Sequence, residues 1–287
     1  MLMMKKLVLT LMLSLFVTGS LCAQPLSGTL AKIADSGVMK LGFRHSQPPM
    51  SSVNGSGKPE GYSIDLCEQI ASGVQTKIGK DIKIDYVSVG VEDRFSALTT
   101  GKIDILCGST TKTHARGEVV DFTQLTFVTG ASFMTMKGNN IRNNFGGKKI
   151  GVVQDTTTVI ALKDLFSDTD TGASVVTFAT TNKALKALEE GAIDAFSSDQ
   201  VVLIGLAVAD GNKGKYTILP DLFSYEPFAL AVPRNDADFR LVADRVISKL
   251  CRSGEILKIY DRWFSPFSVT RNSAFEVLVE LNATPEN

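Results

Sequence analysis

A run of small hydroxyl side chains followed by an arginine comes directly after an apolar segment, in residues 107–116 (CGSTTKTHAR). The apolar residues 103–106 have the character of a buried strand. Hydroxyl groups and free backbone N–H groups at a helix start bind anions, and a planar guanidinium suits a carboxylate held through two hydrogen bonds. Ser109, Thr111 and Arg116 are therefore candidates for a carboxylate site at a strand end, with a helix expected to begin just after the hydroxyls.

A second strand end resembles the first but carries the opposite charge. Residues 96–109 (SALTTGKIDILCGS) align without gaps on residues 186–199 (KALEEGAIDAFSSD). In both, a helical pattern closes on Gly, the usual left-handed stop, and an Ile-Asp pair opens a short strand. The second copy ends on Asp199, whose carboxylate suits an ammonium. A carboxylate site on one lobe and an ammonium site on an equivalent second lobe describe an α-amino acid.

Strand-like and helix-like patterns alternate through both halves of the chain. Strands are expected at residues 38–43, 82–89, 103–107, 150–153, 174–179 and 193–196. Helices are expected at residues 64–79, 92–100, 156–166, 183–190, 201–209 and 236–251, and residues 46–60 are expected to be a loop. The β-α-β-α-β order in each half predicts mostly parallel sheets flanked by helices.

Two extended apolar segments, residues 121–137 and 227–232, connect the halves. The predicted fold is therefore α/β with two lobes joined by two extended crossings, which form a hinge. Lobe 1 is expected to comprise residues 24–129 and 228–287, and lobe 2 residues 130–227. Because ligands bind outside the carboxyl ends of strands in open α/β sheets, the site is expected between the lobes.

The first 23 residues have the features of a secretory signal peptide. Lys5 and Lys6 precede the apolar residues 7–17, and the segment ends in Leu-Cys-Ala at residue 23. The apolar run is too short for a membrane anchor, and acylation at Cys22 is disfavoured by the bulky Leu21 before it. We expect cleavage after Ala23 and a periplasmic protein without direct membrane insertion.

The composition excludes several classes of function. The chain of 287 residues has 30 basic and 30 acidic residues, so no electrostatic surface for nucleic acid is indicated. Loss of Cys22 with the signal peptide leaves Cys67, Cys107 and Cys251. An odd number allows at most one disulfide, and which cysteines pair, including Cys67 with Cys251, stays open. No cysteine lies in a CxxC motif or near a histidine at metal spacing, so neither a metal nor a cofactor is expected.

Two motifs carry a specific resemblance. Residues 61–66 (GYSIDL) resemble the G-[FY]-[DS]-x-[DE]-[LY] segment of extracellular solute-binding proteins of the polar amino-acid family (family 3). Residues 94–105 (RFSALTTGKIDI) resemble that family's R-[FIW]-x-x-L-x-x-G-x-x-D-x. The glutamate/aspartate-binding members of bacterial ABC importers share the CGSTT strand end, and the likeness covers residues 30–264. It implies a type II periplasmic-binding-protein fold and a monomer that delivers an amino acid to an inner-membrane ABC permease.

The resemblance also implies roles for individual residues. The expected ligands of the α-carboxylate are Ser109, Thr111, Arg116, Thr156 and Thr157. Asp199 is expected to bind the α-ammonium, and Arg44 and Arg94 the side-chain carboxylate of an acidic ligand. Tyr62 is either a pocket wall or a core residue. Two positions differ from the pattern of the glutamate/aspartate-binding members: Thr181 stands where a histidine is expected, and Val91 where a serine is expected. His45 is a possible substitute for that histidine.

Three arginines against Asp199 would leave the cleft with two positive charges, which favours glutamate or aspartate. If Arg44 or Arg94 points away, the ligand class widens to other polar amino acids, such as glutamine. An enzyme similar to periplasmic cyclohexadienyl dehydratases is a weaker alternative, because the candidates include no acid or base suited to proton transfer. A ligand-sensing module is another, although such domains are usually fused to a membrane helix, whereas residues 282–287 at the end of this chain are polar.

Overall fold

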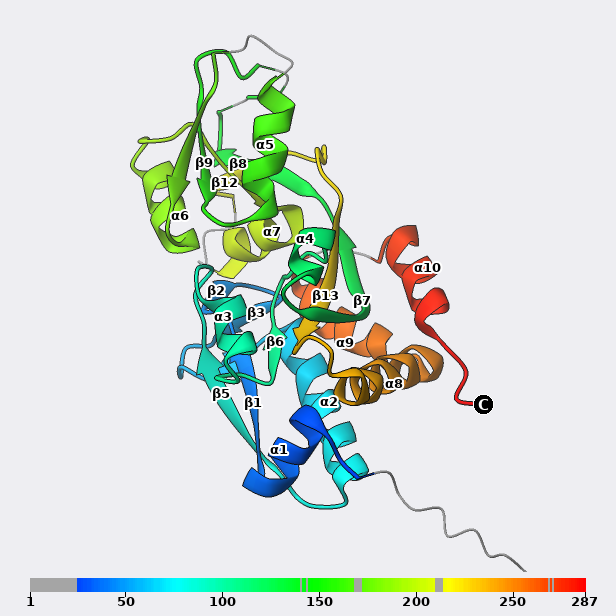
Figure 1. Cartoon of the computed structure of the whole chain (residues 1–287). Helices are drawn as coiled ribbons and strands as arrows, with labels where there is room; N and C mark the ends of the chain where they lie inside the picture. Colours follow the sequence, from blue (N-terminus) through cyan, green and yellow to red (C-terminus); the bar gives the residue numbers. More distant parts are fainter. Residues whose placement is uncertain are drawn as a thin grey trace, which may run out of the picture.

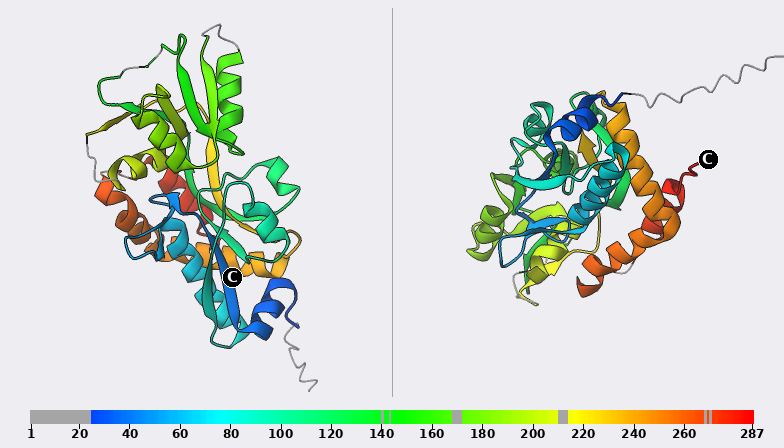
Figure 2. Two further views of the ribbon diagram at one scale, coloured as in Figure 1. Left: turned by 90° about the vertical axis from the view of Figure 1, so that its left-hand side faces the viewer. Right: turned by 90° about the horizontal axis from the view of Figure 1, so that it is seen from below.

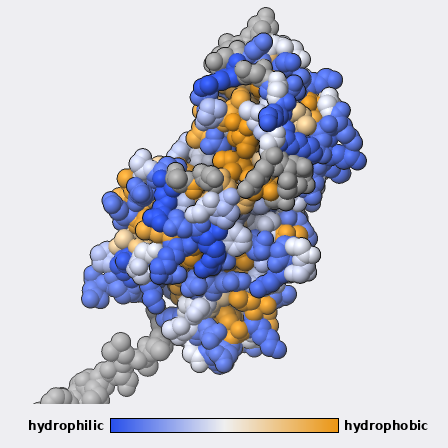
Figure 3. All heavy atoms as spheres, turned by 180° about the vertical axis from the view of Figure 1, so that it is seen from behind, coloured by the Kyte–Doolittle hydropathy of each residue, from blue (hydrophilic) through white to orange (hydrophobic). Residues whose placement is uncertain are grey.

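The computed structural model describes residues 25–139, 141–142, 144–167, 172–209, 214–267, 269 and 271–287. The predicted signal peptide lies outside the described residues. The chain forms two α/β lobes, one above the other in Figure 1, each built on a five-stranded sheet. No helix in the described ranges is long and apolar enough to cross a membrane. Figure 3 shows hydrophilic residues over most of one face, with apolar residues in scattered groups.

The sheet of lobe 1 has the strand order β5-β1-β6-β13-β7. These strands are β1 (Val38–Phe43), β5 (Lys83–Ser88), β6 (Ile105–Cys107), β7 (Asp121–Thr129) and β13 (Glu226–Val232). Strand β1 pairs in parallel with β5 and β6, whereas β13 is antiparallel to β6 and β7. The parallel part follows from the β-α-β order along the chain. The antiparallel part comes from the two crossings.

The sheet of lobe 2 has the order β10-β9-β11-β8-β12. These strands are β8 (Ala131–Met136), β9 (Lys149–Val153), β10 (Ser174–Phe178), β11 (Ala195–Asp199) and β12 (Tyr216–Ile218). Strands β10, β9 and β11 are parallel, and β8 is antiparallel to β11 and β12. In each sheet four strands therefore run in one direction, and one strand, β13 in lobe 1 and β8 in lobe 2, runs in the other.

Helices flank both sheets. In lobe 1 they are α1 (Gly28–Ser36), α2 (Tyr62–Ile78), α3 (Arg94–Thr99), α4 (His114–Gly117), α8 (Ala237–Ser253), α9 (Glu255–Phe264), the 3₁₀ helix η1 (Ser265–Phe267) and α10 (Ser273–Asn282). In lobe 2 they are α5 (Thr157–Ser167), α6 (Thr181–Glu189) and α7 (Gln200–Ala209). The view from below in Figure 2 shows the orange to red helices along one side of the molecule, where α8 packs beside α2.

The two crossings lie side by side between the lobes (Figure 1). Strand β7 continues through Gly130 into β8, and Glu226 at the start of β13 pairs with Thr129 at the end of β7. A Cβ atom at Gly130 would lie 2.3 Å from the carbonyl oxygen of Ser224. Because backbone occupies that space, only glycine allows the crossings to approach so closely.

Residues 46–60 differ from the expected loop. They form a small antiparallel sheet of β2 (Ser46–Gln47), β3 (Ser51–Val53) and β4 (Pro59–Glu60). Strands of two or three residues are too short for an alternating pattern to be recognised, and the Pro, Gly and Ser content of the segment indicates turns.

Tyr62 belongs to the core of lobe 1 and does not form a pocket wall. Its side chain is 0% exposed, and its hydroxyl donates a hydrogen bond to the Thr126 carbonyl oxygen at 2.9 Å. The Tyr62 ring lies edge-on to Phe127 and Phe264, with centroids 5.9 and 5.5 Å away. Phe127 stacks on Phe264 in turn. These rings join α2, the first crossing and α9, so Tyr62 supports the base of the hinge.

The cysteine pairing left open by the sequence is Cys67 with Cys107, whose Cα atoms are 6.2 Å apart, and Cys251 is a free, buried thiol. The disulfide joins α2 to the last residue of β6. It therefore holds the strand end that precedes Ser109.

Candidate functional site

Six parallel strand ends converge where the lobes meet. The carboxyl ends of β1, β5 and β6 in lobe 1 lead to the same cavity as the ends of β9, β10 and β11 in lobe 2, as expected for open α/β sheets. The cavity is lined by Arg44, Gln47, Val91, Arg94, Ser109, Thr110, Thr111, Arg116, Val153, Thr156, Thr157, Thr181, Ser198 and Asp199. The structure brings together nine of the ten site residues proposed from the sequence, all except Tyr62.

The hydroxyl residues of lobe 1 reach the cavity from an extended segment. Thr111 forms a bridge with Phe228 of β13, and the Lys112 N–H donates to the Pro227 carbonyl oxygen at 2.8 Å. Helix α4 begins only at His114, where Thr113 is the N-cap and accepts from the Arg116 N–H at 3.2 Å. The helix expected just after the hydroxyls is therefore confirmed, but the hydroxyls themselves are held by the second crossing and not by the helix.

In lobe 2, three helices begin directly after the converging strands. Helix α5 begins at Thr157 after β9, α6 at Thr181 after β10 and α7 at Gln200 after β11. The Thr156 hydroxyl donates to the Val153 carbonyl oxygen at 2.7 Å. Its proton is therefore used within the strand-to-helix turn.

Two of the three arginines are held in fixed orientations. Nη2 of Arg94, a residue 5% exposed, donates to the Asp155 carbonyl oxygen across the lobes at 2.9 Å, and its Nη1 donates to the Val91 carbonyl oxygen. Nη1 of Arg116 donates to the Thr111 carbonyl oxygen at 2.7 Å. The Phe95 ring lies 4.6 Å from the Arg94 guanidinium and 5.5 Å from that of Arg116. Phe95 was not proposed from the sequence, although it follows Arg94 in the RF motif.

Burial lowers the pKa of all three arginines below its ordinary value. Loss of solvation lowers the pKa of Arg44 to about 10 and that of Arg94 to about 9, and the charges of Arg116 and Arg44 lower the latter further. Burial also lowers the pKa of Arg116. All three remain charged at neutral pH, so the cavity concentrates positive charge that is only partly solvated. An anion entering the cavity would relieve this repulsion.

Three buried polar atoms in the described residues have no hydrogen-bond partner: Gln47 Oε1, Ser109 Oγ and Asp199 Oδ1. All three residues line the cavity. Leaving a buried polar atom unsatisfied costs about 1–3 kcal/mol, so their convergence indicates a place for a polar ligand. Gln47 was not proposed from the sequence, because residues 46–60 were expected to be a loop.

The carboxylate of Asp199 is destabilised in the cavity without a ligand. Burial raises the pKa of Asp199 to about 8, the negative charge of Glu226 raises it too, and Arg116 opposes both. A cation placed at the unpartnered Oδ1 would favour the ionised form again. Asp199 is thus suited to an ammonium.

Glu226 is the main charged residue near the site that the sequence analysis missed. It is 2% exposed, and its carboxylate accepts hydrogen bonds from the hydroxyls of Thr111 at 2.5 Å, Thr157 at 2.7 Å and Ser224 at 2.8 Å. The second crossing was expected to begin one residue later, at Pro227. The sequence signal that could have identified Glu226 is its position as the one charged residue at the start of the otherwise apolar segment EPFALAV.

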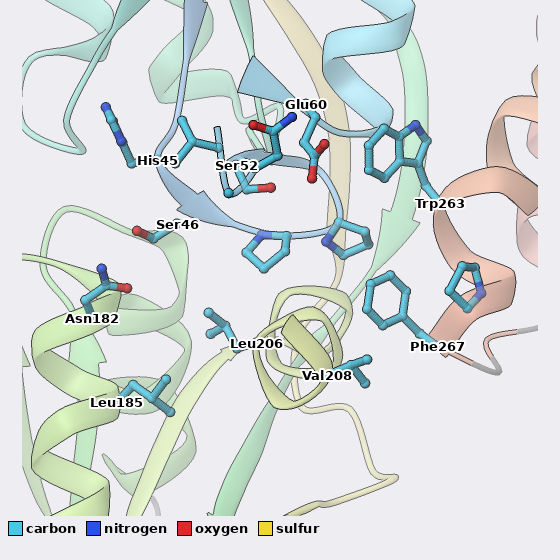
Figure 4. Close-up of a pocket in the computed structure, with 16 residues that line it drawn as sticks. His45, Ser46, Ser52, Glu60, Asn182, Leu185, Leu206, Val208, Trp263 and Phe267 are labelled. Atoms are coloured by element: carbon cyan, nitrogen blue, oxygen red, sulfur yellow. The ribbon is translucent and has the colours of Figure 1, made fainter. Parts of the chain in front are cut away.

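A second hollow between the lobes, of about 570 Å³, has different chemistry (Figure 4). His45 and Ser46 approach it from lobe 1, and Leu185 and Leu206 from α6 and α7, with Trp263 and Phe267 at the far end. Among the described residues that line it, Glu60 alone carries a formal charge, so it lacks the group of arginines found in the smaller cavity. His45 lines this hollow and not the arginine cavity, so it does not replace the histidine expected at Thr181.

The two lobes approach each other closely beside this hollow. A Cβ atom at Gly205 of α7 would lie 2.0 Å from the Pro48 carbonyl oxygen of lobe 1. We therefore expect Gly205→Ala to hold the lobes apart. Small-angle scattering should show a larger radius of gyration than wild type at saturating ligand, together with weaker binding. Gly55→Ala is the matched control, because nothing lies within 4 Å of its Cβ position; equal scattering from both variants would contradict this role of Gly205.

Comparison with known proteins places these features in a family. The family model of bacterial extracellular solute-binding proteins, family 3, matches residues 39–266. An L-glutamate/L-aspartate-binding protein of Pseudomonas aeruginosa is 30% identical over 260 residues, which cover 89% of this chain and 86% of the relative. A glutamine-binding protein of Bacillus subtilis is 29% identical, over 82% of this chain and 84% of the relative. An ancestral arginine-binding protein solved with arginine is 26% identical, with a TM-score of 0.71. The match covers 79% of this chain and 98% of that protein.

Proposed function

This chain belongs to the bacterial extracellular solute-binding proteins of family 3, and from that premise we propose that it captures glutamate or aspartate between its lobes for an ABC importer. Its relatives are solute-binding proteins, which are not enzymes. Two relatives have names that support the ligand and the import pathway. One is the L-glutamate/L-aspartate-binding protein. The other is a glutamate/aspartate import solute-binding protein of Escherichia coli, 29% identical over 91% of this chain and 88% of the relative. The proposal includes an exported, periplasmic monomer that docks on an inner-membrane permease.

The observation that carries the proposal is a set of three arginines, Arg94 buried and Arg44 and Arg116 half-buried, that line one cavity with the unpartnered Oδ1 of Asp199. Arg116 keeps guanidinium nitrogens that no described residue bonds, and Ser109 has an unpartnered hydroxyl; together they suit an α-carboxylate. Asp199 suits the α-ammonium. Arg44, with Arg94 beside it, is the partner for a side-chain carboxylate.

The charge of the cavity favours an acidic amino acid over a neutral or basic one. Glu226 is a second negative group beside Asp199. Once the ligand ammonium has ionised Asp199, three arginines and two carboxylates leave one positive charge rather than the two expected from the sequence. Glutamate or aspartate carries a net charge of −1 and neutralises the site. Glutamine would leave a guanidinium unmatched, and arginine would add to the repulsion, which is costly where water is excluded.

Ligand capture would proceed by closure of the lobes. The ligand first meets Arg116 and Ser109 on lobe 1, and rotation about the crossings brings Asp199 onto its ammonium. Charged hydrogen bonds strengthen as water leaves, because the local dielectric falls. Arg94 already bonds the Asp155 carbonyl oxygen of lobe 2, so it supports the closed form. The closed form is the shape offered to the permease.

Titration calorimetry of the ligand-free mature protein tests the proposal. We expect tight binding of glutamate or aspartate and weak binding of glutamine and arginine. Arg44→Gln should weaken glutamate binding by roughly tenfold or more and leave glutamine unchanged, because it removes a charged hydrogen bond to the side-chain carboxylate alone. The guanidinium of Arg44 bonds no described residue, so the change should not disturb the fold. Preference of the wild type for glutamine or arginine would instead make it a binder of other polar amino acids.

A further inference from the structure

Glu226 lies directly behind two hydroxyls of the cavity wall. Its Oε2 accepts from both Thr111 and Thr157, and its Oε1 accepts from Ser224. No lysine or arginine in the described part of the chain forms an ion pair with it, although its charge acts on Arg116 and Asp199. A carboxylate held only by neutral hydroxyls keeps its negative field, and this field extends into the cavity.

The hydrogen bonds to Glu226 determine how the cavity wall meets a ligand. A threonine hydroxyl has one proton to donate, and both Thr111 and Thr157 give theirs to the carboxylate. The contact between the two hydroxyl oxygens is longer, at 3.4 Å. Toward the cavity the pair therefore presents lone pairs, which accept from an ammonium and repel a carboxylate oxygen. This reverses the expectation from the sequence, in which these hydroxyls bind the α-carboxylate.

We propose that Glu226 is the positioning residue by which the cavity selects ligands with an ammonium group and rejects carboxylic acids that lack one. The inference rests on the proposed function. With Glu226 ionised, the cavity has one positive charge, which matches an acidic amino acid. A dicarboxylate without the amino group carries a charge of −2 and meets acceptor oxygens. If Glu226 is replaced by glutamine, the cavity has two positive charges, and the side chain behind the hydroxyls has one acceptor oxygen instead of two.

The test compares glutamate with glutarate, which has the same carbon chain and both carboxylates but no amino group. In calorimetric titrations we expect the wild type to prefer glutamate by roughly 100-fold or more. Glu226→Gln should lower this ratio by roughly tenfold or more, with glutamate binding weaker and glutarate binding stronger, as expected when a close charge interaction is lost. Glu226→Asp, which keeps the charge, should retain most of the preference.

Ser224→Ala is the matched control. It removes a hydrogen bond to the same carboxylate without changing its charge, so the ratio should stay at the wild-type value. Thermal melting of each variant shows whether it is folded. If Glu226→Gln weakens both ligands equally, or leaves the ratio unchanged, Glu226 is only a structural element of the hinge and the inference is overturned.

The ratio of glutamate to glutarate affinity tests the role of Glu226, whereas the affinity of the wild type for each amino acid tests the proposed function. If the wild type binds glutamine instead of glutamate, the proposed acidic specificity fails, and glutamine with its analogue glutaramate replaces the ligand pair. A reduced ratio in Glu226→Gln would then still support selection of the ammonium. If the wild type binds no amino acid, the inference falls together with the proposed function.

Discussion

Replacing Arg116 by alanine is expected to weaken amino-acid binding by roughly 100-fold or more. The reason is that the half-buried guanidinium has only one nitrogen bonded within the protein: Nη1 donates to the Thr111 carbonyl oxygen, which leaves the other nitrogens for the α-carboxylate. A charged hydrogen bond contributes about 1.5–3 kcal/mol, and a bidentate carboxylate pair makes two. Titration calorimetry with the best wild-type ligand measures the loss.

A lysine variant separates the contribution of the charge of Arg116 from that of its planar shape. Arg116→Lys keeps the charge but removes the planar fork, so we expect an affinity between those of the wild type and the alanine variant. Arg245→Ala is the surface control, because its exposed ion pair with Glu286 lies far from the cavity lining. Wild-type affinity in Arg116→Ala would refute its assignment to the α-carboxylate.

Replacing Asp199 by asparagine is expected to abolish measurable binding while stabilising the protein without ligand at neutral pH. The folded protein raises the pKa of Asp199 from its ordinary 3.8 to about 8, chiefly by burial. The folded state therefore holds the proton more tightly than the unfolded state. Its contribution to stability is fully present below about pH 4 and is lost as the pH rises toward 8. Asparagine has no proton to lose and keeps that stability.

Thermal melting across this pH range checks the effect on stability. The Tm of Asp199→Asn should exceed that of the wild type by at least about 2 °C at pH 8, and the difference should shrink toward pH 4. Added ligand should raise the Tm of the wild type alone. A variant less stable than the wild type at pH 8 would show that the Asp199 carboxylate is already satisfied in the empty protein.

Ligand binding should also release protons near pH 7 if Asp199 meets the ammonium. Part of the Asp199 population is protonated there, and a cation at Oδ1 favours the ionised form. Calorimetry in buffers with different ionisation enthalpies measures this release. Asp164→Asn, at a position on α5 that does not line the cavity, is the matched control for both experiments and should behave as the wild type.

The sequence by itself was sufficient for the architecture and most of the cavity wall. Period-2 and helical patterns are local, so the alternation of strands and helices is readable without the fold. Parallel strands bring their carboxyl ends to one edge of each sheet, and residues as distant as Arg44 and Asp199 line one cavity where the two edges meet; their binding of a ligand stays a prediction. The strand ends at Ser109 and Asp199 could be recognised from the repeat within the chain and from the chemistry of their side chains.

Only the tertiary structure decided what lies behind and beside those residues. Glu226 meets Thr111 and Thr157 because the second crossing runs along the first, a pairing that local periodicity does not encode. Gln47 reaches the cavity from strands too short to show a pattern, and the folded positions of α2 and β6 select Cys67 and Cys107 as the disulfide partners. Residue types and spacing thus identified most of the groups that line the cavity, whereas their protons, charges and pairings depend on contacts between distant segments.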